Sequence, residues 1–144
     1  MERTNIEYQG VSMEKKIEKV LEEKEEGSGA CALHEFLNHF GDKWSMLIVL
    51  HLGHAGKLRF NELKKRIQLI SQRMLTVTLR SLEMDGLVSR KVYAEIPPRV
   101  EYQLTPLGKS LLELMTVFGE WANQHADEIM EARKQFQKRQ KAKK

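Results

Sequence analysis

The sequence predicts a mainly α-helical chain with one small β-hairpin. Three observations lead to that class. Apolar residues recur at helical spacing along most of the 144 residues. Extended, β-branched and aromatic residues stand on both sides of a proline pair at 97–98, which is typical of a stiff hairpin turn. Directly after the hairpin, Thr105 and Pro106 form a strong helix start, a capping residue followed by a proline.

The first part of the chain is predicted to hold three helices and a short strand. Residues 13–26 carry an amphipathic stripe, and residues 33–40 form a second short helix. The segment 43–52 is apolar nearly all round, which is typical of a buried helix, and we expect Gly53 to end it. Residues 57–60 are predicted to be a strand.

Two short helices and the hairpin come next. Asn61 is expected to cap the first helix and Ser71 the second, which runs to about Asp85. Residues 87–93 and 99–104 are the predicted strands of the hairpin. Two short helices joined by a tight turn and followed by a hairpin are the parts of a winged helix-turn-helix.

The last helix is predicted to be long. From Thr105 its apolar stripe continues for more than twenty residues, whereas the basic residues from Arg133 are expected to fray. Because a small domain cannot cover such a stripe alone, we expect a homodimer through Leu111–Ile129, with the apolar strip 13–21 beside it. The expected organisation is a helical extension (1–26), a winged helix-turn-helix (31–104), a dimerisation helix of the same domain (105–132) and a basic tail (133–144).

Charge is distributed unevenly along a chain of net charge +4. Residues 57–99 hold ten Lys/Arg and four Asp/Glu, whereas residues 1–26 hold eight acids and five bases. A basic middle is expected of a polyanion-binding module, although a solvated charged face is the alternative. The longest apolar run, 46–50, is far shorter than the ~20 residues of a membrane span. A polar N-terminus and a single cysteine favour the cytoplasm.

The helix expected at 71–83 has two chemically distinct faces. On a helical wheel Leu75, Leu79 and Leu82 lie together and would anchor that side to the core. The opposite side offers arginine for guanine, glutamine for adenine and small methyl groups for thymine, which favours readout of the DNA major groove. An ordinary solvated face is the alternative. The candidate residues are Gln72, Arg73, Thr76, Val77 and Arg80.

The proline pair gives the hairpin the properties of a DNA-binding wing. Pro97 and Pro98 stiffen the turn, so Arg99 is presented at low entropic cost. An arginine on such an arm suits the narrow, negatively polarised minor groove. A plain β-turn with an exposed arginine is the alternative.

Five segments between Cys31 and Trp121 resemble the HxlR-type family of bacterial winged-helix transcriptional regulators, relatives of the MarR group. They are GDKWSMLIV (41–49), LRFNEL (58–63), ISQRMLTVTLRSLEMDGLVSR (70–90), EIPPRVEYQLTPLGKSL (95–111) and FGEW (118–121). The resemblance implies a cytoplasmic homodimer that binds duplex DNA at a near-palindromic operator, with repression as the expected outcome. By position it assigns DNA contacts to Ser71, Gln72, Arg73, Thr76, Val77, Arg80 and Arg99, with Lys57 and Arg59 near phosphates.

The chain departs from the family pattern in three places. Many members have glycine before the recognition helix, where this chain has Gln68 and Leu69. The usual Cys-Pro pair is Cys31-Ala32, and the usual Gly-Gly before the tryptophan is Gly41-Asp42. The geometry of the turn before the recognition helix therefore does not follow from the resemblance.

Other classes of function find less support. A thiol enzyme would use Cys31 with His34, but no orienting third group accompanies them. His51 and His54 suggest a metal, yet Gly53 is expected to break the helix between them and no further ligands follow. We therefore predict no enzyme, no metal and no cofactor. A winged helix used only for protein contacts is the main alternative, and the basic recognition face argues against it.

Cys31 is a candidate redox sensor. It stands at a helix N-terminus, where unpaired backbone N–H groups favour the thiolate. An inert cysteine is the alternative, whereas the resemblance implies thiol sensing, because some family members respond to thiol-reactive stress at the matching cysteine. With one cysteine in the chain, oxidation could yield only an intersubunit Cys31–Cys31 disulfide or a mixed disulfide with a small thiol.

Overall fold

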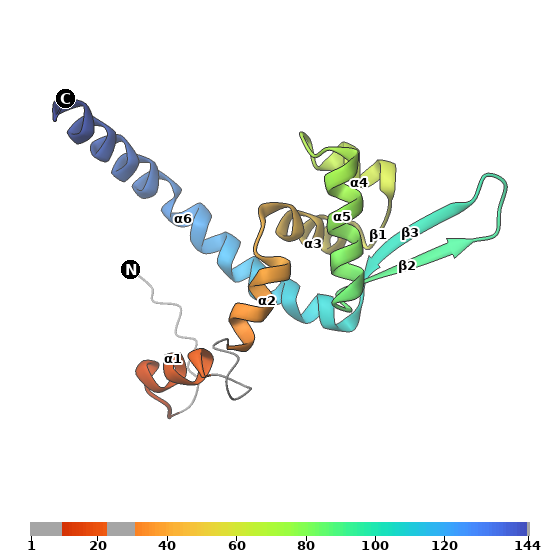
Figure 1. Cartoon of the computed structure of the whole chain (residues 1–144), viewed down its shortest axis with the longest axis horizontal. Helices are drawn as coiled ribbons and strands as arrows, with labels where there is room; N and C mark the ends of the chain where they lie inside the picture. Colours follow the sequence, from red (N-terminus) through yellow and green to blue (C-terminus); the bar gives the residue numbers. More distant parts are fainter. Residues whose placement is uncertain (1–9, 23–30, 144) are drawn as a thin grey trace. The chain divides into compact units, whose positions relative to one another are not determined.

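The computed structural model of the chain describes residues 10–22 and 31–143, which fall into two units, 1–41 and 42–144 (Figure 1). In the first unit, α1 covers Met13–Leu21 and α2 covers Ala32–Phe40. The helix predicted over 13–26 is thus confirmed to Leu21, and residues 23–26 lie outside the described part. The apolar stripe of α1 is exposed to solvent, with each of its four residues more than half exposed.

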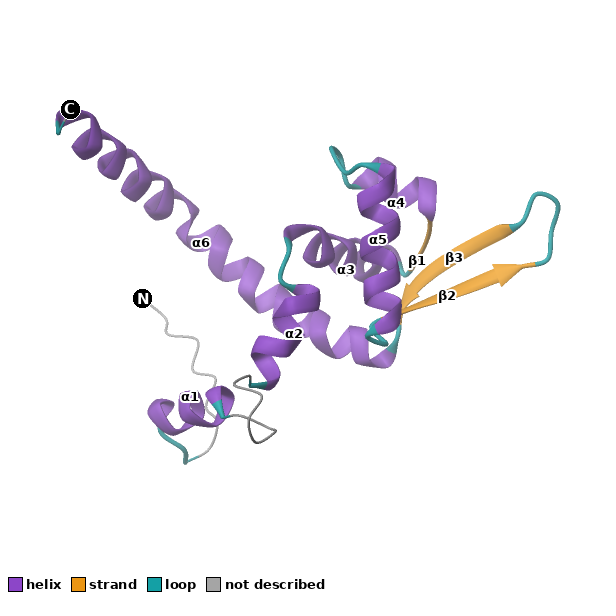
Figure 2. Ribbon diagram, viewed as in Figure 1, coloured by secondary structure: helices purple, strands orange, loops and turns teal. Residues whose placement is uncertain are grey.

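The second unit carries the expected winged helix-turn-helix, mostly helical with a small sheet (Figure 2). Three strands pair antiparallel in the order β1-β3-β2, so the hairpin gains a third strand at its base. Buried leucines of α3, α4 and α5 form the core with residues of the sheet. The elements are α3 (Lys43–Ala55), β1 (Lys57–Arg59), α4 (Phe60–Arg66), α5 (Gln72–Met84), β2 (Val88–Tyr93), β3 (Arg99–Leu104) and α6 (Pro106–Ala142).

Two predicted helix boundaries are wrong. Helix α3 does not end at Gly53 but continues to Ala55, and Gly56 caps it with φ +83°. Gly53 is a packing residue, because a Cβ there would overlap the Leu112 side chain of α6. Likewise α4 begins at Phe60, before Asn61, since the Arg59 backbone N–H donates to Glu62 Oε1 at 2.9 Å and closes the first turn.

The C-terminal tail is also different from the expectation. Instead of fraying from Arg133, α6 continues to Ala142 and is 37 residues long. Its last part is rich in Lys, Arg, Gln and Ala, which all favour helix without needing a packed face. The Gln135 side chain donates to Glu131 Oε1 at 3.0 Å, one turn earlier.

Candidate nucleic-acid interface

Helix α5 separates into the two faces that its sequence predicts. Leu75, Leu79 and Leu82 are at most 2% exposed. Arg73 and Arg80 lie on the solvent side with Val77, which is 55% exposed. Within the described residues neither guanidinium group has an ion-pair partner. Both can therefore bind an acceptor from outside the chain.

Hydroxyl groups at the start of α5 have partners within the helix. Ser71 is the N-cap, and its Oγ accepts from the Met74 backbone N–H at 3.0 Å. Thr76 Oγ1 donates to the Gln72 carbonyl at 2.9 Å. The hydroxyl hydrogen of Thr76 is thereby engaged, and its methyl group and oxygen lone pairs are left for an outside contact. The Gln72 side chain is exposed at the same end of the helix.

The turn between α4 and α5 has an unusual backbone. Leu69 has φ +74°, where L-residues with large side chains are rare, and its side chain is 97% exposed. Ile67 and Ile70 are each 3% exposed and hold the turn against the core on either side. Leu69, where many family members have glycine, therefore adopts the left-handed conformation between two buried isoleucines.

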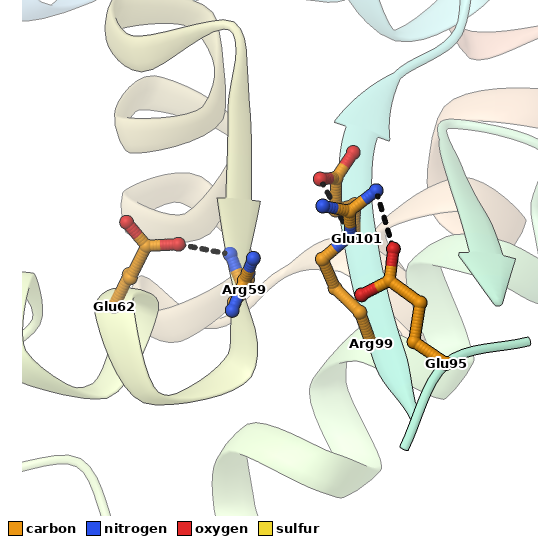
Figure 3. Close-up of polar contacts among 5 residues, drawn as sticks. All are labelled: Arg59, Glu62, Glu95, Arg99 and Glu101. Atoms are coloured by element: carbon orange, nitrogen blue, oxygen red, sulfur yellow. Dashed lines mark hydrogen bonds and ion pairs between the residues drawn. The ribbon is translucent and has the colours of Figure 1, made fainter. Parts of the chain in front are cut away.

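In the wing, Arg99 is not the free arginine that its position after Pro98 suggests. Its side chain lies between two carboxylates, with Nη2 at 3.4 Å from Glu95 Oε1 and Nε at 3.4 Å from Glu101 Oε1 (Figure 3). The Nε contact lacks hydrogen-bond geometry, so it is an ion pair only. The guanidinium carbon lies 4.1 Å from the centroid of the Tyr93 ring, across the strand pair. Arg99 thus stabilises the end of the hairpin next to the turn, where β2 ends and β3 begins.

Several exposed cations of this surface escaped sequence reasoning. Lys91 and Arg90 lie exposed on β2, and the Lys91 ammonium sits 4.9 Å from the Tyr93 ring centroid. Lys64 and Lys65 are exposed in the last turn of α4. A signal was present, because these residues form adjacent basic pairs in the segments next to the recognition helix. Adjacent pairs place at least one charge on the outer face of any helix or strand.

The two predicted flanking residues, Lys57 and Arg59, stand at the two ends of β1 and are both exposed. Arg59 is exposed and lines a groove of about 420 Å³ together with the wing tip, including Ile96 and Arg99. Lys57 instead lines a separate cavity of about 520 Å³ at the start of α6. Arg59 therefore lies nearer the tip of the wing, opposite Glu101, and Lys57 lies nearer its base, opposite Gln103.

His51 and His54 both belong to α3, so the expected helix break between them is wrong. Arg66 Nη1 lies within hydrogen-bond distance of His54 Nδ1, at 3.3 Å. Burial, and then the positive charges of Arg66 and His54, lower the pKa of His51 below 6.5. Residues 10–22 and 31–143 contain no group of three or more His, Cys, Asp or Glu side chains placed to hold a metal ion.

One side of α6 exposes a long apolar stripe. Met115, which the wheel placed in this stripe, is buried against its own domain. The His125 ring packs against the Trp121 ring at a tilt of 38°, with centroids 4.8 Å apart, and continues the stripe toward Ile129. Apolar residues spaced alternately three and four apart are typical of a helix-helix seam. The exposed members include Leu107, Leu114, Phe118, Trp121 and Phe136.

Cys31 is the N-cap of α2 and is half-buried. Its Sγ accepts from the His34 backbone N–H at 3.4 Å. The expected position at a helix N-terminus is thus confirmed. The contact to His34 uses the backbone and not the imidazole, so the thiol and ring are not arranged as a nucleophile and base.

The fold and this surface define a winged helix-turn-helix protein. Residues 39–130 match the HxlR-like helix-turn-helix family, and the chain belongs to that family. An uncharacterised HTH-type transcriptional regulator from Methanothermobacter thermautotrophicus is 47% identical over 95 residues, which are 66% of this chain and 72% of the relative. No described helix is both long and apolar enough to span a membrane.

Solved structures agree with this assignment. The redox regulator HypR in its reduced form is 39% identical, with a TM-score of 0.64 over 69% of this chain and 97% of that one. The reduced transcriptional regulator YodB from B. subtilis is 33% identical, with a TM-score of 0.55 over 66% of this chain and 93% of that one. The predicted fold class and family are therefore confirmed.

Proposed function

We propose that the protein is a transcriptional regulator that binds a specific DNA operator through α5. The observation that carries the proposal is the solvent face of α5, where Arg73 and Arg80 flank Val77 and have no ion-pair partner among the described residues. Arginine can bridge O6 and N7 of guanine, and a valine methyl can contact the thymine methyl. Gln72 and Thr76 supply further contacts, and Ser71 supports the helix start.

Charged residues around α5 would position the protein on the phosphates. Lys64, Lys65 and Lys91 are exposed, as is Arg59 beside the wing. Arg99 would reach the minor groove only by exchanging one of its carboxylate partners for DNA, so we assign it a smaller share. Lys57 lies on the same strand as Arg59 but toward the base of the wing, and we assign it a contribution of long-range charge only.

The proposal is tested by selection of genomic fragments followed by titration. The protein should retain a subset of fragments, and the recovered duplex should bind about 10³-fold or more tightly than a scrambled duplex of the same length. Repeating the titration at two salt concentrations separates phosphate binding from base readout. Equal affinity for both duplexes at both salts would instead favour a winged helix used for protein contacts.

The regulator is proposed to act as a homodimer through the apolar stripe of α6. Two recognition helices would then lie about one DNA turn apart, ~34 Å, and the recovered operator should be near-palindromic. Phe118 is 60% exposed in the middle of the stripe. Phe118→Glu places a charge in the seam and should convert the dimer to a monomer in sedimentation experiments.

Asn123→Glu is the matched control for the dimer, because it adds the same charge on the opposite side of α6. It should leave the dimer intact. A wild-type chain that sediments as a monomer at micromolar concentration, with and without operator, would exclude the proposed assembly. The strip of α1 is a further candidate contact that this experiment does not require.

We expect the regulator to act as a repressor, because a dimer bound on a promoter would block polymerase. Reporter transcription with and without the protein measures this effect.

A thiol response through Cys31 is a second proposal. It is supported by the His34 N–H that donates to the sulfur and by the similarity to a redox regulator. Diamide would accept two electrons and two protons from two Cys31 thiols, giving an intersubunit disulfide and a hydrazine. Operator affinity should then change in the wild type and not in Cys31→Ser. Equal affinity of treated and untreated wild type would leave the regulator without this response.

A further inference from the structure

The turn between α4 and α5 contains a leucine whose placement neither packing nor backbone preference explains. Leu69 is 97% exposed, so burial in its own chain contributes nothing to it. Its φ of +74° is a conformation that glycine adopts without steric cost and leucine does not. A single exposed apolar residue is ordinary on a protein surface, but one that also holds a strained backbone is not.

Leu69 projects into solvent beside the N-terminus of α5. Ile67 and Ile70 fix the turn from the core side, so Gln68 and Leu69 project into solvent between them. Two residues later Ser71 caps α5, whose first residues are the ones that enter the major groove in a helix-turn-helix. Leu69 therefore stands at the end of the recognition helix that lies deepest on DNA.

We propose that Leu69 is a DNA-contacting residue, which packs its side chain on an apolar surface at the edge of the major groove. Two parts of DNA offer such a surface there, the C5-methyl group of thymine and the hydrocarbon side of a deoxyribose. This inference rests on the proposed function of α5. The left-handed turn would then serve to present the Leu69 side chain to DNA, which a glycine at this position could not do.

The test combines stability with affinity in full-length variants. Leu69→Gly removes both the side chain and the strain, so the Tm should rise by a few degrees while affinity for the selected operator falls by about threefold to tenfold. Leu69→Met keeps an apolar side chain and should bind within about twofold of wild type, without the rise in Tm. Val11→Gly, which removes an exposed apolar side chain from the other unit of the chain, is the control and should leave operator affinity unchanged.

Duplexes in which deoxyuridine replaces thymine distinguish the two DNA surfaces. If the contact is a thymine methyl, one substituted position weakens binding by wild type and not by Leu69→Gly. If the contact is deoxyribose, each substituted position, including any thymine that Val77 contacts, changes the affinity of the two proteins by the same factor. Operator affinity of Leu69→Gly equal to wild type would overturn the inference and leave the proposed function standing. Failure of the wild type to prefer any duplex would overturn both.

Discussion

The recognition helix and the wing both carry arginine, but they hold it in opposite ways. On α5, Arg73 and Arg80 extend into solvent, and within the described residues no carboxylate pairs with either. In the wing, Arg99 contacts Glu95, Glu101 and the Tyr93 ring at once. Residue type alone would rank the three equally as DNA contacts. Their partners rank them differently.

The difference has an electrostatic and an entropic side. An unpaired exposed arginine keeps its full charge for DNA but must lose side-chain freedom when it binds. Arg99 is already ordered, yet two carboxylates nearby offset its charge and repel phosphates. The helix is thus suited to reading bases, and the wing is suited to presenting a stiff shape with cations such as Lys91 at its side.

The largest expected effect comes from the helix. Arg73→Ala should weaken binding to the selected operator by about 1–3 kcal/mol, because a bidentate contact to guanine is lost, and should change binding to scrambled DNA much less. The measurement is a titration of both duplexes at one salt concentration. An equal loss on both duplexes would make Arg73 a phosphate contact and remove the distinction between the two regions.

A smaller effect is expected from the wing. Arg99→Ala leaves two uncompensated carboxylates next to DNA, so operator affinity should fall by roughly 0.5–1 kcal/mol, with a similar small loss of stability. Adding Glu95→Gln and Glu101→Gln should restore most of that affinity if Arg99 acts mainly by neutralising them. A triple variant as weak as Arg99→Ala would show that Arg99 contacts DNA directly, as its sequence position suggests.

The smallest effect concerns α3, which packs against both the recognition helix α5 and the wing strand β3. The pKa of His51 is lower in the folded chain than its ordinary value of 6.5 in the unfolded chain. Below pH 6.5 the unfolded chain therefore binds a proton at His51 more readily than the folded chain does. Stability should therefore fall as pH decreases through and below that value, and His51→Gln should lessen the fall. Urea midpoints at about pH 7.5 and about pH 5.5 measure it. Equal pH dependence of the urea midpoint in wild type and His51→Gln would show that His51 does not cause the loss of stability.

Local patterns predicted what depends on local physics. The leucine spacing of α5 placed Arg73 and Arg80 on the outer face, because helical periodicity is a property of neighbouring residues. The cap and proline at Thr105 and Pro106 likewise located the start of α6.

The missed features depend on contacts between distant segments. Gly53 lies inside a helix, where the absence of a side chain leaves room for Leu112, far along the chain. Arg99 meets Tyr93 through the register of β2 and β3, which a turn sequence does not specify, whereas Glu101 lies two residues along the same strand and on the same face. The left-handed backbone of Leu69 was not predicted either, because this conformation is typical of glycine and nothing in the local sequence indicates it.

Helix α6 is fixed to the base of the wing at its first turn, so a small change of angle there displaces the far end of the helix. Thr105 donates from its backbone to the Leu87 carbonyl at 3.1 Å and from its hydroxyl to the Gly86 carbonyl at 2.6 Å. Gly108 packs so closely on Leu87 that a Cβ would overlap the carbonyl. A helix of 37 residues is about 55 Å long, so a tilt of about 5° at one end moves the other by about 5 Å. That displacement exceeds the ~3.4 Å rise of one base pair, so in the proposed dimer the stiffness of this junction would limit how much variation in half-site spacing can be accommodated.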